Sequence, residues 1–361
     1  MSHRKKATSS VRSLTDGAPD HTIGSRTLDD DEDVWNFNAW DHVEPPEEHI
    51  AMVDELLAKQ AETRVDQQNA DLYHQNAANY WDKFYSRHEN RFFKDRKWLH
   101  LEFPELVQAT NKDAGPMRIV EVGCGAGNTV FPLLEMNQNP ALDLVACDYA
   151  EQAVNVVKTN PLCQDPPMGH CQAHVWDLSA GTAGEASLPP GIDPGSVDIV
   201  VLVFVFSALH PREWASAVNN VYTMLRPKTG LVLFRDYGRH DLPQLRFKKN
   251  RLLDDNFYVR GDGTRVYFFD PQELYTAFDA MSREASQLEM DKSEVSAANS
   301  EPQSLKIDHD AANHVQVSSA RPMSPSRFVT LQMAVDRRLL VNRKERKRMY
   351  RVWVQAKFRK R

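Results

Sequence analysis

The chain has 361 residues, of which 41% are hydrophobic, and a formal net charge of −6 at pH 7. Such a length holds one large domain or two, and the hydrophobic fraction is enough for a substantial core. The net charge is not that of a general nucleic-acid binder, so any argument about partners depends on local charge. No apolar run reaches the roughly 18 residues of a membrane-spanning helix, which predicts a protein without a membrane segment.

The cysteines predict free thiols in a reducing compartment, because Cys124 and Cys147 fall in or beside predicted core strands. We therefore expect a cytoplasmic protein, although the basic, serine-containing first residues have a faint transit-peptide character that would suit a mitochondrion. One further group is close enough in sequence to suggest metal ligands: Cys163, His170, Cys171 and His174. It lacks a C-x-x-C pair and is interrupted by two prolines, so we expect no metal site.

Residues 1–33 are polar and aperiodic, which predicts a disordered tail. Residues 34–115 are predicted to form a helical region in front of the main domain. It begins with Val34–Trp40, whose two tryptophans and one phenylalanine need a surface to bury against. The spacing of apolar residues predicts one helix from Pro46 to about Val65 and another over Ala77–Tyr85.

Residues 87–98 interleave basic and aromatic side chains. Cations suit phosphates and flat rings suit unstacked bases, so this run predicts a single-stranded RNA contact. An amphipathic helix with a solvated basic face is the alternative interpretation. The candidate contacts in this run are Arg91, Phe93, Lys94, Asp95 and Arg96.

The main domain is organised around residues 118–128, which predict a strand, a tight turn and the start of a helix. Glycines fall at every second position after the acidic Glu121: Gly123, Gly125 and Gly127. Glycine is needed where a side chain would block the approach of a ligand to the backbone. The G-x-G-x-G spacing is neither a dinucleotide fingerprint nor a P-loop, and no lysine follows to neutralise a phosphate. The turn therefore suits the uncharged ribose and the aminoacyl group of S-adenosyl-methionine.

Three further apolar segments are predicted to be strands, and two of them end at a carboxylate. Leu142–Cys147 ends at Asp148, about 20 residues past the last glycine, where this fold places a ribose-binding carboxylate. Ala173–Trp176 ends at Asp177, placed to accept from the adenine amino group, and Val197–Phe206 is apolar enough for a central parallel strand. These segments predict an α/β, class I (Rossmann-like) methyltransferase fold with a seven-stranded, mostly parallel sheet.

This domain is expected to cover residues 116–361, with a disordered insertion at about 281–325. Asn256–Arg265 predicts a hairpin with Asp262-Gly263 in its turn, which would form a basic lid over the pocket. Met349–Phe358 predicts a closing strand, with Tyr350, Val352, Val354 and Phe358 on its buried face. Residues 343–348 form a basic turn before it, solvated but available to phosphate. Further phosphate-contact candidates are Lys248, Lys249 and Arg260.

These elements together resemble the tRNA N3-methylcytidine methyltransferases, in the branch with the fungal tRNA-threonine enzyme. The resemblance covers nearly everything except the first 30 residues and the insertion. Six motifs carry it: Phe37-Asn38-Ala39-Trp40-Asp41, Phe92-Phe93-Lys94-Asp95-Arg96, Glu121-Val122-Gly123-Cys124-Gly125-Ala126-Gly127-Asn128, Phe204-Val205-Phe206-Ser207-Ala208-Leu209-His210-Pro211, Phe234-Arg235-Asp236-Tyr237-Gly238 and Asn256-Phe257-Tyr258-Val259-Arg260.

The resemblance implies S-adenosyl-methionine as cofactor and a set of contacts to it: Trp81, Tyr85, Gly123, Asp148, Asp177, Leu178 and Val203. Asp177 follows Trp176 where the family usually has cysteine, but the carboxylate is present. The implied substrate is cytosine 32 in the anticodon loop of tRNA-threonine, or also of tRNA-serine, with seryl-tRNA synthetase assisting some relatives. Residues 1–33 do not resemble the actin-binding segment of the yeast relative, so we do not expect actin binding from this chain.

The chemistry expected is an in-line methyl transfer to N3 of cytosine, whose lone pair is free at neutral pH, so no proton has to be removed first. The enzyme's task is then to expose and align the base and to exclude water. Asp236 and Asp241 are candidates to stabilise the cationic product. For Asp236 a structural salt bridge with Arg235 or Arg239 is the alternative. The competing functions are those of a small-molecule or protein methyltransferase and of a non-catalytic actin- or RNA-binding module.

Overall fold

The computed structural model describes residues 26–29, 31–96, 98–182, 185–278 and 326–361. Its centre is an eight-stranded sheet in the order β1-β12-β13-β8-β7-β2-β3-β4. The strands are β1 (Ala39–Asp41), β2 (Met117–Val122), β3 (Leu142–Asp148), β4 (His170–Val175), β7 (Ile199–Val203), β8 (Leu231–Tyr237), β12 (Phe328–Asn342) and β13 (Lys347–Lys360). The predicted seven strands become eight because β1, from the N-terminal region, pairs antiparallel with β12.

The five strands from β8 to β4 are parallel and form the middle of the molecule. Every residue of β7 is buried, as the continuous apolar run of its sequence predicts for a strand covered on both faces. The parallel strands all end at one edge, and this edge carries the glycine turn after β2 and Asp148 at the end of β3. The predicted α/β fold with a mostly parallel sheet is thus confirmed.

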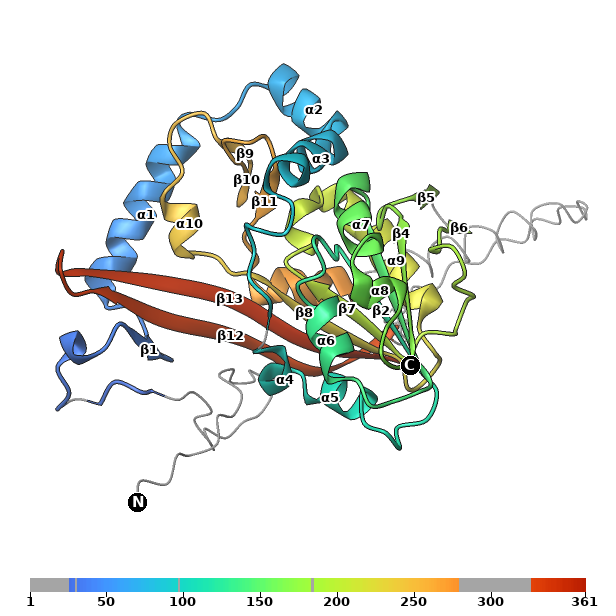
Figure 1. Ribbon diagram of the computed structural model, residues 1–361. Coiled ribbons are helices and arrows are strands. Elements are labelled where there is room, and N and C mark those ends of the chain that lie inside the picture. Colours follow the sequence, from blue (N-terminus) through green and yellow to red (C-terminus); the bar gives the residue numbers. More distant parts are fainter. Residues whose placement is uncertain (1–25, 30, 97, 183–184, 279–325) are drawn as a thin grey trace, which may run out of the picture.

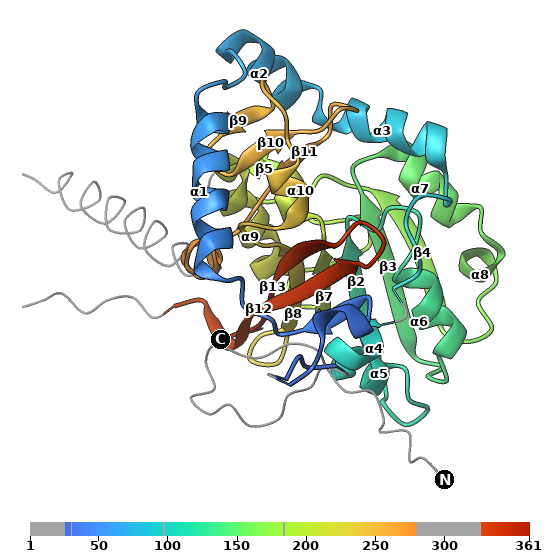
Figure 2. The same cartoon turned by 90° about the vertical axis from the view of Figure 1, so that its left-hand side faces the viewer.

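Helices cover both faces of the sheet (Figures 1 and 2). One face packs on α4 (Leu99–Glu102), α5 (Pro104–Ala109), α6 (Val130–Met136), α7 (Glu151–Lys158) and α8 (Pro161–Gln164). The other packs on α9 (Trp214–Met224) and on an aromatic group that includes Phe206, Phe278 and Phe358. The strands are therefore apolar on both faces, and the binding residues lie at the edge of the sheet.

The N-terminal region is part of the fold rather than a separate extension. It contains the 3-10 helix η1 (Val34–Asn36), then α1 (Glu47–Ala61), α2 (Gln67–Gln75) and α3 (Ala77–His88). Trp40 on β1 is fully buried among Leu339, Val341 and Tyr350 of β12 and β13, and its indole donates to the carbonyl of Val34 at 2.8 Å. This is the burial surface that the aromatic run Val34–Trp40 requires.

Two segments predicted to be disordered lie mostly or wholly outside the described residues. Most of the predicted tail, residues 1–33, and all of the predicted insertion, 281–325, lie there. The described part of the tail is not detached, because the carbonyl of Arg26 accepts from the backbone of Asp41 at 2.7 Å and Leu28 packs near Trp40. Within the described residues, no helix combines the length and the apolar character needed to cross a bilayer.

A small sheet stands beside the main one: β9 (Leu252–Asp254), β10 (Phe257–Val259) and β11 (Arg265–Tyr267). β10 and β11 are the predicted hairpin, with Val259 opposite Arg265 and Asp262-Gly263 in the turn. The hairpin follows α10 (Leu242–Leu245), and two 3-10 helices, η2 (Phe206–Ala208) and η3 (Pro211–Glu213), connect β7 to α9. A two-stranded ribbon pairs β5 (Gly181–Thr182) with β6 (Glu185–Ala186).

The closing strand is confirmed and is longer than predicted. β13 pairs with β8 on one side and with β12 on the other, and β12 and β13 form a long hairpin whose tip extends past β1 (Figure 1). The predicted inner face is buried: Tyr350, Val352, Val354 and Phe358. The opposite face carries Arg351, Trp353 and Gln355, and these side chains belong to the candidate site.

Candidate active site

The glycine turn is shaped by close neighbours. Gly123 and Gly125 both have positive φ, +65° and +53°, which L side chains rarely adopt. A Cβ on Gly123 would collide with the side chain of Val205, and one on Gly125 with the hydroxyl of Tyr85. The amide of Gly125 donates to Asp148 Oδ2 at 3.0 Å, which fixes the turn to the end of β3. The turn thus brings backbone, an aromatic ring and a carboxylate together.

A cavity of about 50 Å³ lies at this turn. Six predicted cofactor contacts are among its lining residues: Trp81, Tyr85, Gly123, Asp148, Asp177 and Leu178. Gly125 lines a larger cavity that adjoins the small one. Gly127 and Val203 line neither cavity, because Gly127 packs against Phe131 and Val203 is buried in the core at the end of β7. Sequence reasoning missed Tyr149 and Val205, which also line the small cavity.

Asp148 and Asp177 differ in their surroundings. Asp148 is buried and accepts from the amides of Ala150 and Gly125 at 2.9 and 3.0 Å, but desolvation is the larger effect and raises its pKa to about 6. Asp177 is exposed and accepts from the amide and hydroxyl of Ser179, both at 2.8 Å. Both carboxylates thus line the small cavity, one buried and one exposed, and their contacts with ribose and adenine stay predictions.

Glu121 lies under the glycine turn and is almost completely buried. Burial raises its pKa to about 7, although Arg96 donates to its Oε1 at 3.2 Å and opposes the shift. Arg96 also donates to the hydroxyl of Thr129 at 2.9 Å. Its guanidinium is therefore directed into the protein, under the turn, as well as towards the larger cavity that it lines. The hydroxyl of Thr129 and the amide of Val130 also hydrogen-bond to the Glu121 carboxylate and oppose the shift of its pKa.

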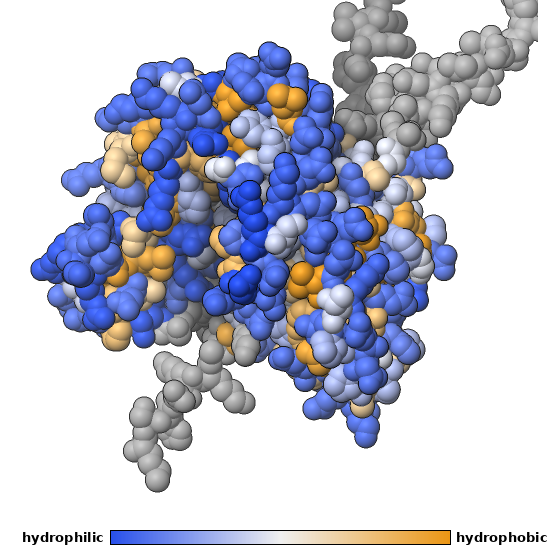
Figure 3. Space-filling model, turned by 45° about the horizontal axis from the view of Figure 1, so that its top comes forward, coloured by the Kyte–Doolittle hydropathy of each residue, from blue (hydrophilic) through white to orange (hydrophobic). Residues whose placement is uncertain are grey.

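The larger cavity, of about 620 Å³, adjoins the small one. The two share five lining residues: Trp81, Tyr85, Gly123, Phe204 and Ala208. Seven cationic side chains line the larger cavity: Lys94, Arg96, Arg235, Arg260, Arg265, Arg338 and Arg351. Among the described residues, only two acids, Glu102 and Asp262, line it with them. The top of the molecule, hollowed near its middle and mostly hydrophilic, is shown in Figure 3.

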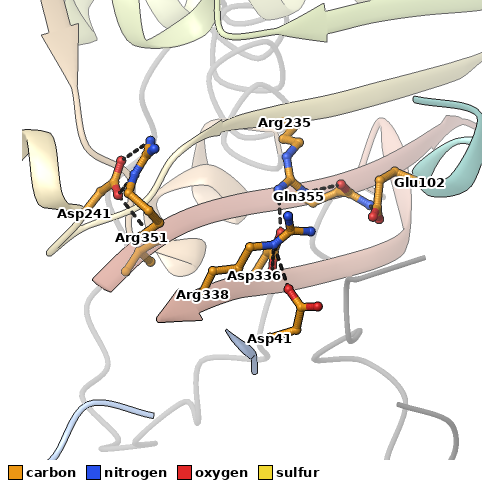
Figure 4. A network of polar contacts seen from close by, with 9 residues as sticks. Asp41, Glu102, Arg235, Asp241, Asp336, Arg338, Arg351 and Gln355 are labelled. Atoms are coloured by element: carbon orange, nitrogen blue, oxygen red, sulfur yellow. Dashed lines mark hydrogen bonds and ion pairs between the residues drawn. The ribbon is translucent and has the colours of Figure 1, made fainter. Parts of the chain in front are cut away.

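Carboxylates behind the wall of this cavity hold three of its arginines (Figure 4). Arg235 donates to Asp336 at 2.5 Å and to Gln355 at 2.7 Å, while Arg351 makes two bonds to Asp241, at 2.7 and 3.2 Å. Arg338 Nε lies 2.9 Å from Asp41 Oδ1, on β1. Asp241 and Asp336 are fully buried, so these acids fix the orientation of the guanidinium groups at the cavity wall.

Comparison with known proteins agrees with this geometry. Residues 120–231 match a family model described as a methyltransferase domain. The chain is 43% identical over 336 residues to the tRNA(Thr) (cytosine(32)-N(3))-methyltransferase of Saccharomyces cerevisiae, covering 93% of this chain and 45% of that protein. It is 41% identical to a tRNA N(3)-methylcytidine methyltransferase of Schizosaccharomyces pombe, covering 99% of this chain and 97% of that one.

This chain belongs to the tRNA N3-methylcytidine methyltransferase family. A Drosophila melanogaster member is 38% identical over 93% of this chain and 88% of its own. The chain thus spans less than half of the Saccharomyces relative and most of the other two. Among solved structures, a SAM-dependent methyltransferase from Methanosarcina mazei superposes with a TM-score of 0.42 at 13% identity, covering 72% of this chain and 97% of that one.

The two predicted catalytic carboxylates of this methyltransferase lie behind the cavity wall. Asp236 is fully buried and accepts from the amides of Ser207 and Tyr237 at 2.9 and 2.8 Å; desolvation raises its pKa to about 6. The alternative, a salt bridge with Arg235 or Arg239, is wrong: Arg235 is paired with Asp336, and within the described part of the chain Asp236 forms no ion pair with Arg239. Asp241 caps α10 and binds Arg351. Neither carboxylate lines the cavity, so contact with the base would go through Ser207 or Arg351.

The predicted RNA contacts divide into three groups. Phe93, Lys94, Arg96 and Arg260 line the larger cavity. Arg91 and Asp95 instead line a separate groove of about 540 Å³ that also includes Phe93 and Lys94. Lys248 and Lys249 are exposed and line neither of these. The hairpin β10–β11 borders the larger cavity through Arg260, Asp262, Thr264 and Arg265, as expected of a lid.

The four residues considered as metal ligands do not converge. Among the described residues, no three His, Cys, Asp or Glu side chains form a group that would hold a metal ion. Cys163 and Cys171 are both free thiols, and their sulfurs lie 2.9 Å apart.

Several residues of the site were not predicted from the sequence, among them Trp98, Phe204, Tyr237, Arg338 and Trp353. One signal was available for Trp353, since a tryptophan among Arg351, Gln355 and Lys357 on the polar side of an alternating strand needs its own explanation. Trp98 ends the aromatic and basic run 87–98, directly before α4, and the other three lie far apart in sequence, on or next to strands that pair in the sheet.

Proposed function

We propose that this chain methylates N3 of cytosine 32 in the anticodon loop of tRNA-threonine. The observation that carries the proposal is the junction of the two cavities. The small cavity has the glycine turn and the buried carboxylate of a nucleoside site, and the large one has the cations and rings of an RNA site. Phe204 and Gly123 belong to both, so a base held in the large cavity meets the donor at their boundary.

The residues of the small cavity fit S-adenosyl-methionine, the methyl donor of this family. The turn leaves no room for a Cβ, and Asp148 offers a buried acceptor to ribose hydroxyls beside it. When bound, this cofactor supplies a methyl group made electrophilic by the sulfonium charge.

The chain itself then has to orient the base and exclude water. Cytosine N3 carries a free lone pair, so no side chain is needed as a general base. Aromatic rings and arginines that are already held by buried acids provide a fixed surface for the flipped base. The product base is cationic, and the buried carboxylates behind the wall reduce the positive potential that it meets: Asp241 offsets the charge of Arg351, and Asp236 lies behind Ser207.

The test is a reaction of the purified protein with S-adenosyl-methionine and a tRNA-threonine transcript, followed by nucleoside mass spectrometry. We expect N3-methylcytidine from the normal transcript and none when cytosine 32 is replaced by uridine. Methylation at another atom would contradict the proposal. A folded protein that binds S-adenosyl-methionine but no tRNA would favour a small-molecule or protein methyltransferase instead.

Two finer points belong to the same proposal. We propose a tRNA-serine transcript as a second substrate, with seryl-tRNA synthetase as a partner that raises turnover on it; equal rates with and without the synthetase would argue against that partner. We also propose that the protein acts in the cytoplasm, where its four free cysteines stay reduced. Fractionation of cells that produce the tagged protein would test the location.

A further inference from the structure

Three aromatic side chains form a row along the wall of the larger cavity. Phe204, which follows β7, separates the small cavity from the large one. Its ring centroid lies 4.9 Å from that of Tyr237 at the end of β8. Tyr237 is directly opposite Trp353 on β13 in the antiparallel pairing. All three rings are partly exposed and line the cavity, so the row leads from the cofactor end outward.

Each ring of the row has at least one arginine over it, and Trp353 has three, because the guanidinium carbons of Arg235 and Arg338 also lie over it, at 5.1 and 5.8 Å. The guanidinium carbon of Arg96 lies 5.9 Å from the Phe204 centroid, that of Arg260 lies 5.6 Å from Tyr237, and that of Arg351 lies 4.6 Å from Trp353. These three arginines also line the cavity. A ring with a guanidinium group over it suits single-stranded nucleic acid, because an unpaired base can stack on an aromatic ring or on the plane of an arginine. Here this arrangement occurs three times in sequence along one wall.

The backbone of Phe204 adds an independent observation. Its φ is +59°, and a bulky L residue is a genuine outlier in that region. Its amide donates to the carbonyl of Arg235 at 2.8 Å, which helps to hold the conformation. Strained residues of this kind gather where a structure must place one group accurately. The strain therefore falls on the ring at the boundary of the two cavities, where the reacting base has to be.

We propose that the larger cavity receives three consecutive unpaired nucleotides, one for each ring. The target cytosine stacks on Phe204, and the two nucleotides on its 3′ side stack on Tyr237 and Trp353. This rests on the proposed function and extends it, because it assigns recognition of two neighbouring bases to Tyr237 and Trp353. The cavity then selects a loop that is single-stranded over three nucleotides, and it rejects the same cytosine inside a duplex.

Abasic RNA tests this with the unaltered protein. Anticodon stem-loops are prepared intact, with an abasic site at the second nucleotide 3′ of the target, and with an abasic site near the far end of the loop. We expect kcat/KM to fall roughly 10- to 100-fold for the first abasic RNA, the loss of one stacked base, and to change little for the second. Equal methylation of all three RNAs would overturn the proposal.

A protein variant then assigns the base to its ring. Trp353→Ala should lower kcat/KM on the intact RNA by a similar factor but lose nothing more on the abasic RNA, whereas Trp353→Phe should recover part of the loss. If the abasic site lowers kcat/KM of Trp353→Ala by the same factor as it lowers that of the unaltered protein, the assignment is contradicted. Tyr275→Ala removes an exposed ring outside both cavities and serves as the matched control. Thermal unfolding and S-adenosyl-methionine binding verify that each variant is folded.

A binding measurement separates this inference from the proposed function. With 2-aminopurine at the second nucleotide 3′ of the target, stacking on Trp353 should quench the fluorescence in the unaltered protein and not in Trp353→Ala. Quenching does not depend on turnover. An RNA that is bound and quenched but not methylated would refute the proposed function and support the row of rings. An RNA that is methylated without quenching would support the proposed function and refute the row of rings.

Discussion

Arg96 connects the aromatic and basic run to the floor of the cofactor turn. One guanidinium nitrogen donates both to Glu121 and to Thr129, and the backbone amide of Arg96 donates to the carbonyl of Asn128 at 2.9 Å. From sequence alone, Arg96→Ala is expected to weaken tRNA binding and leave cofactor affinity nearly intact. The geometry replaces that expectation, because the substitution leaves Glu121 buried without its cation.

We therefore predict that Arg96→Ala lowers both stability and S-adenosyl-methionine affinity. Breaking a buried pair by removing one partner costs about 3–5 kcal/mol, and Arg96 is 14% exposed, so a loss near the lower end is expected. Thermal unfolding and isothermal titration measure the two effects. Glu121→Gln in the same chain should restore part of the stability. Lys94→Ala is the control: its side chain is exposed, so only tRNA turnover should fall.

Asp148 makes cofactor binding dependent on pH. Its pKa is raised to about 6 by burial, so it becomes protonated as pH falls from about 7.5 to about 5. A protonated carboxyl accepts hydroxyl donors less well than the charged form, so S-adenosyl-methionine affinity should fall about tenfold over that range. The free energy of unfolding changes with pH in the opposite direction to cofactor affinity. Because the pKa of Asp148 is raised by folding, this residue stabilises the fold at low pH, and the contribution is lost as pH rises through about 6.

Titration of cofactor affinity against pH tests this prediction. Asp148→Asn should bind weakly at every pH and show a flatter profile than the unaltered protein, because no proton is exchanged at that position. Glu121, whose pKa is about 7, titrates close by, and its contribution should remain in the Asp148→Asn profile. An unchanged pH profile in the variant would assign the dependence to Glu121 instead.

At the scale of elements, the hairpin β10–β11 depends on one glycine where it packs against α3. Gly263 has φ of +87°, and a Cβ there would collide with the ring of Tyr80. Gly263→Ala should push the hairpin tip off the helix and displace Arg260 and Arg265 from the cavity. We expect tRNA turnover to fall at least about tenfold, with stability lower by about 1–2 kcal/mol for the left-handed backbone alone.

Gly261→Ala is the matched control for this prediction, since it lies in the same hairpin, has nothing within 4 Å of its would-be Cβ and has no positive φ. It should behave as the unaltered protein in turnover and in thermal unfolding. Gly263→Ala combined with Tyr80→Ala should recover activity if the collision is the cause. Equal effects of the two glycine substitutions would refute the role given to the packing of Gly263 on Tyr80.

The strands differ in how far their sequences predicted them. β7 is a continuous apolar run, and β2 was predicted because its β-branched residues lead into the glycine turn. β12 was not predicted as a strand, because Asp336, Arg337 and Arg338 interrupt its apolar pattern. Asp336 is buried in that strand because Arg235, about 100 positions earlier, neutralises it. A local pattern contains no information about such a partner, and β1 was missed for the same reason.

At the scale of the whole molecule, the cofactor half of the site could be predicted and the substrate half only in part. Gly123, Asp148 and Asp177 each stand at or just after the end of a parallel strand, so topology alone places them together. Trp353 and Arg338 come from a hairpin that closes the sheet far along the chain from Phe204. Trp353 is placed by the antiparallel pairing of β13 with β8, and Arg338 by the pairing of β12 with β13. The sequence specifies neither register.

The charge of the whole molecule leads to a last prediction. The net charge is −6, yet the tip of the hairpin β12–β13 carries five cations and one acid: Arg343, Lys344, Glu345, Arg346, Lys347 and Arg348. Trp353 is six residues from the start of β13, so the tip lies about 20 Å from the cavity along the strand. That separation would let it reach phosphates of the tRNA body while the loop occupies the cavity.

We expect Arg343→Ala with Lys344→Ala to weaken binding of full tRNA and to reduce the slope of log affinity against log salt by about 0.7–0.9 for each phosphate that is no longer neutralised. Both side chains are exposed, so stability should not change. Affinity for a short loop RNA should be unaffected, because such an RNA ends before the tip. Lys112→Ala with Lys228→Ala removes two exposed cations that line none of the cavities described above and is the charge-matched control. If both double variants reduce the slope equally, the effect is one of net charge and the hairpin tip does not bind phosphate specifically.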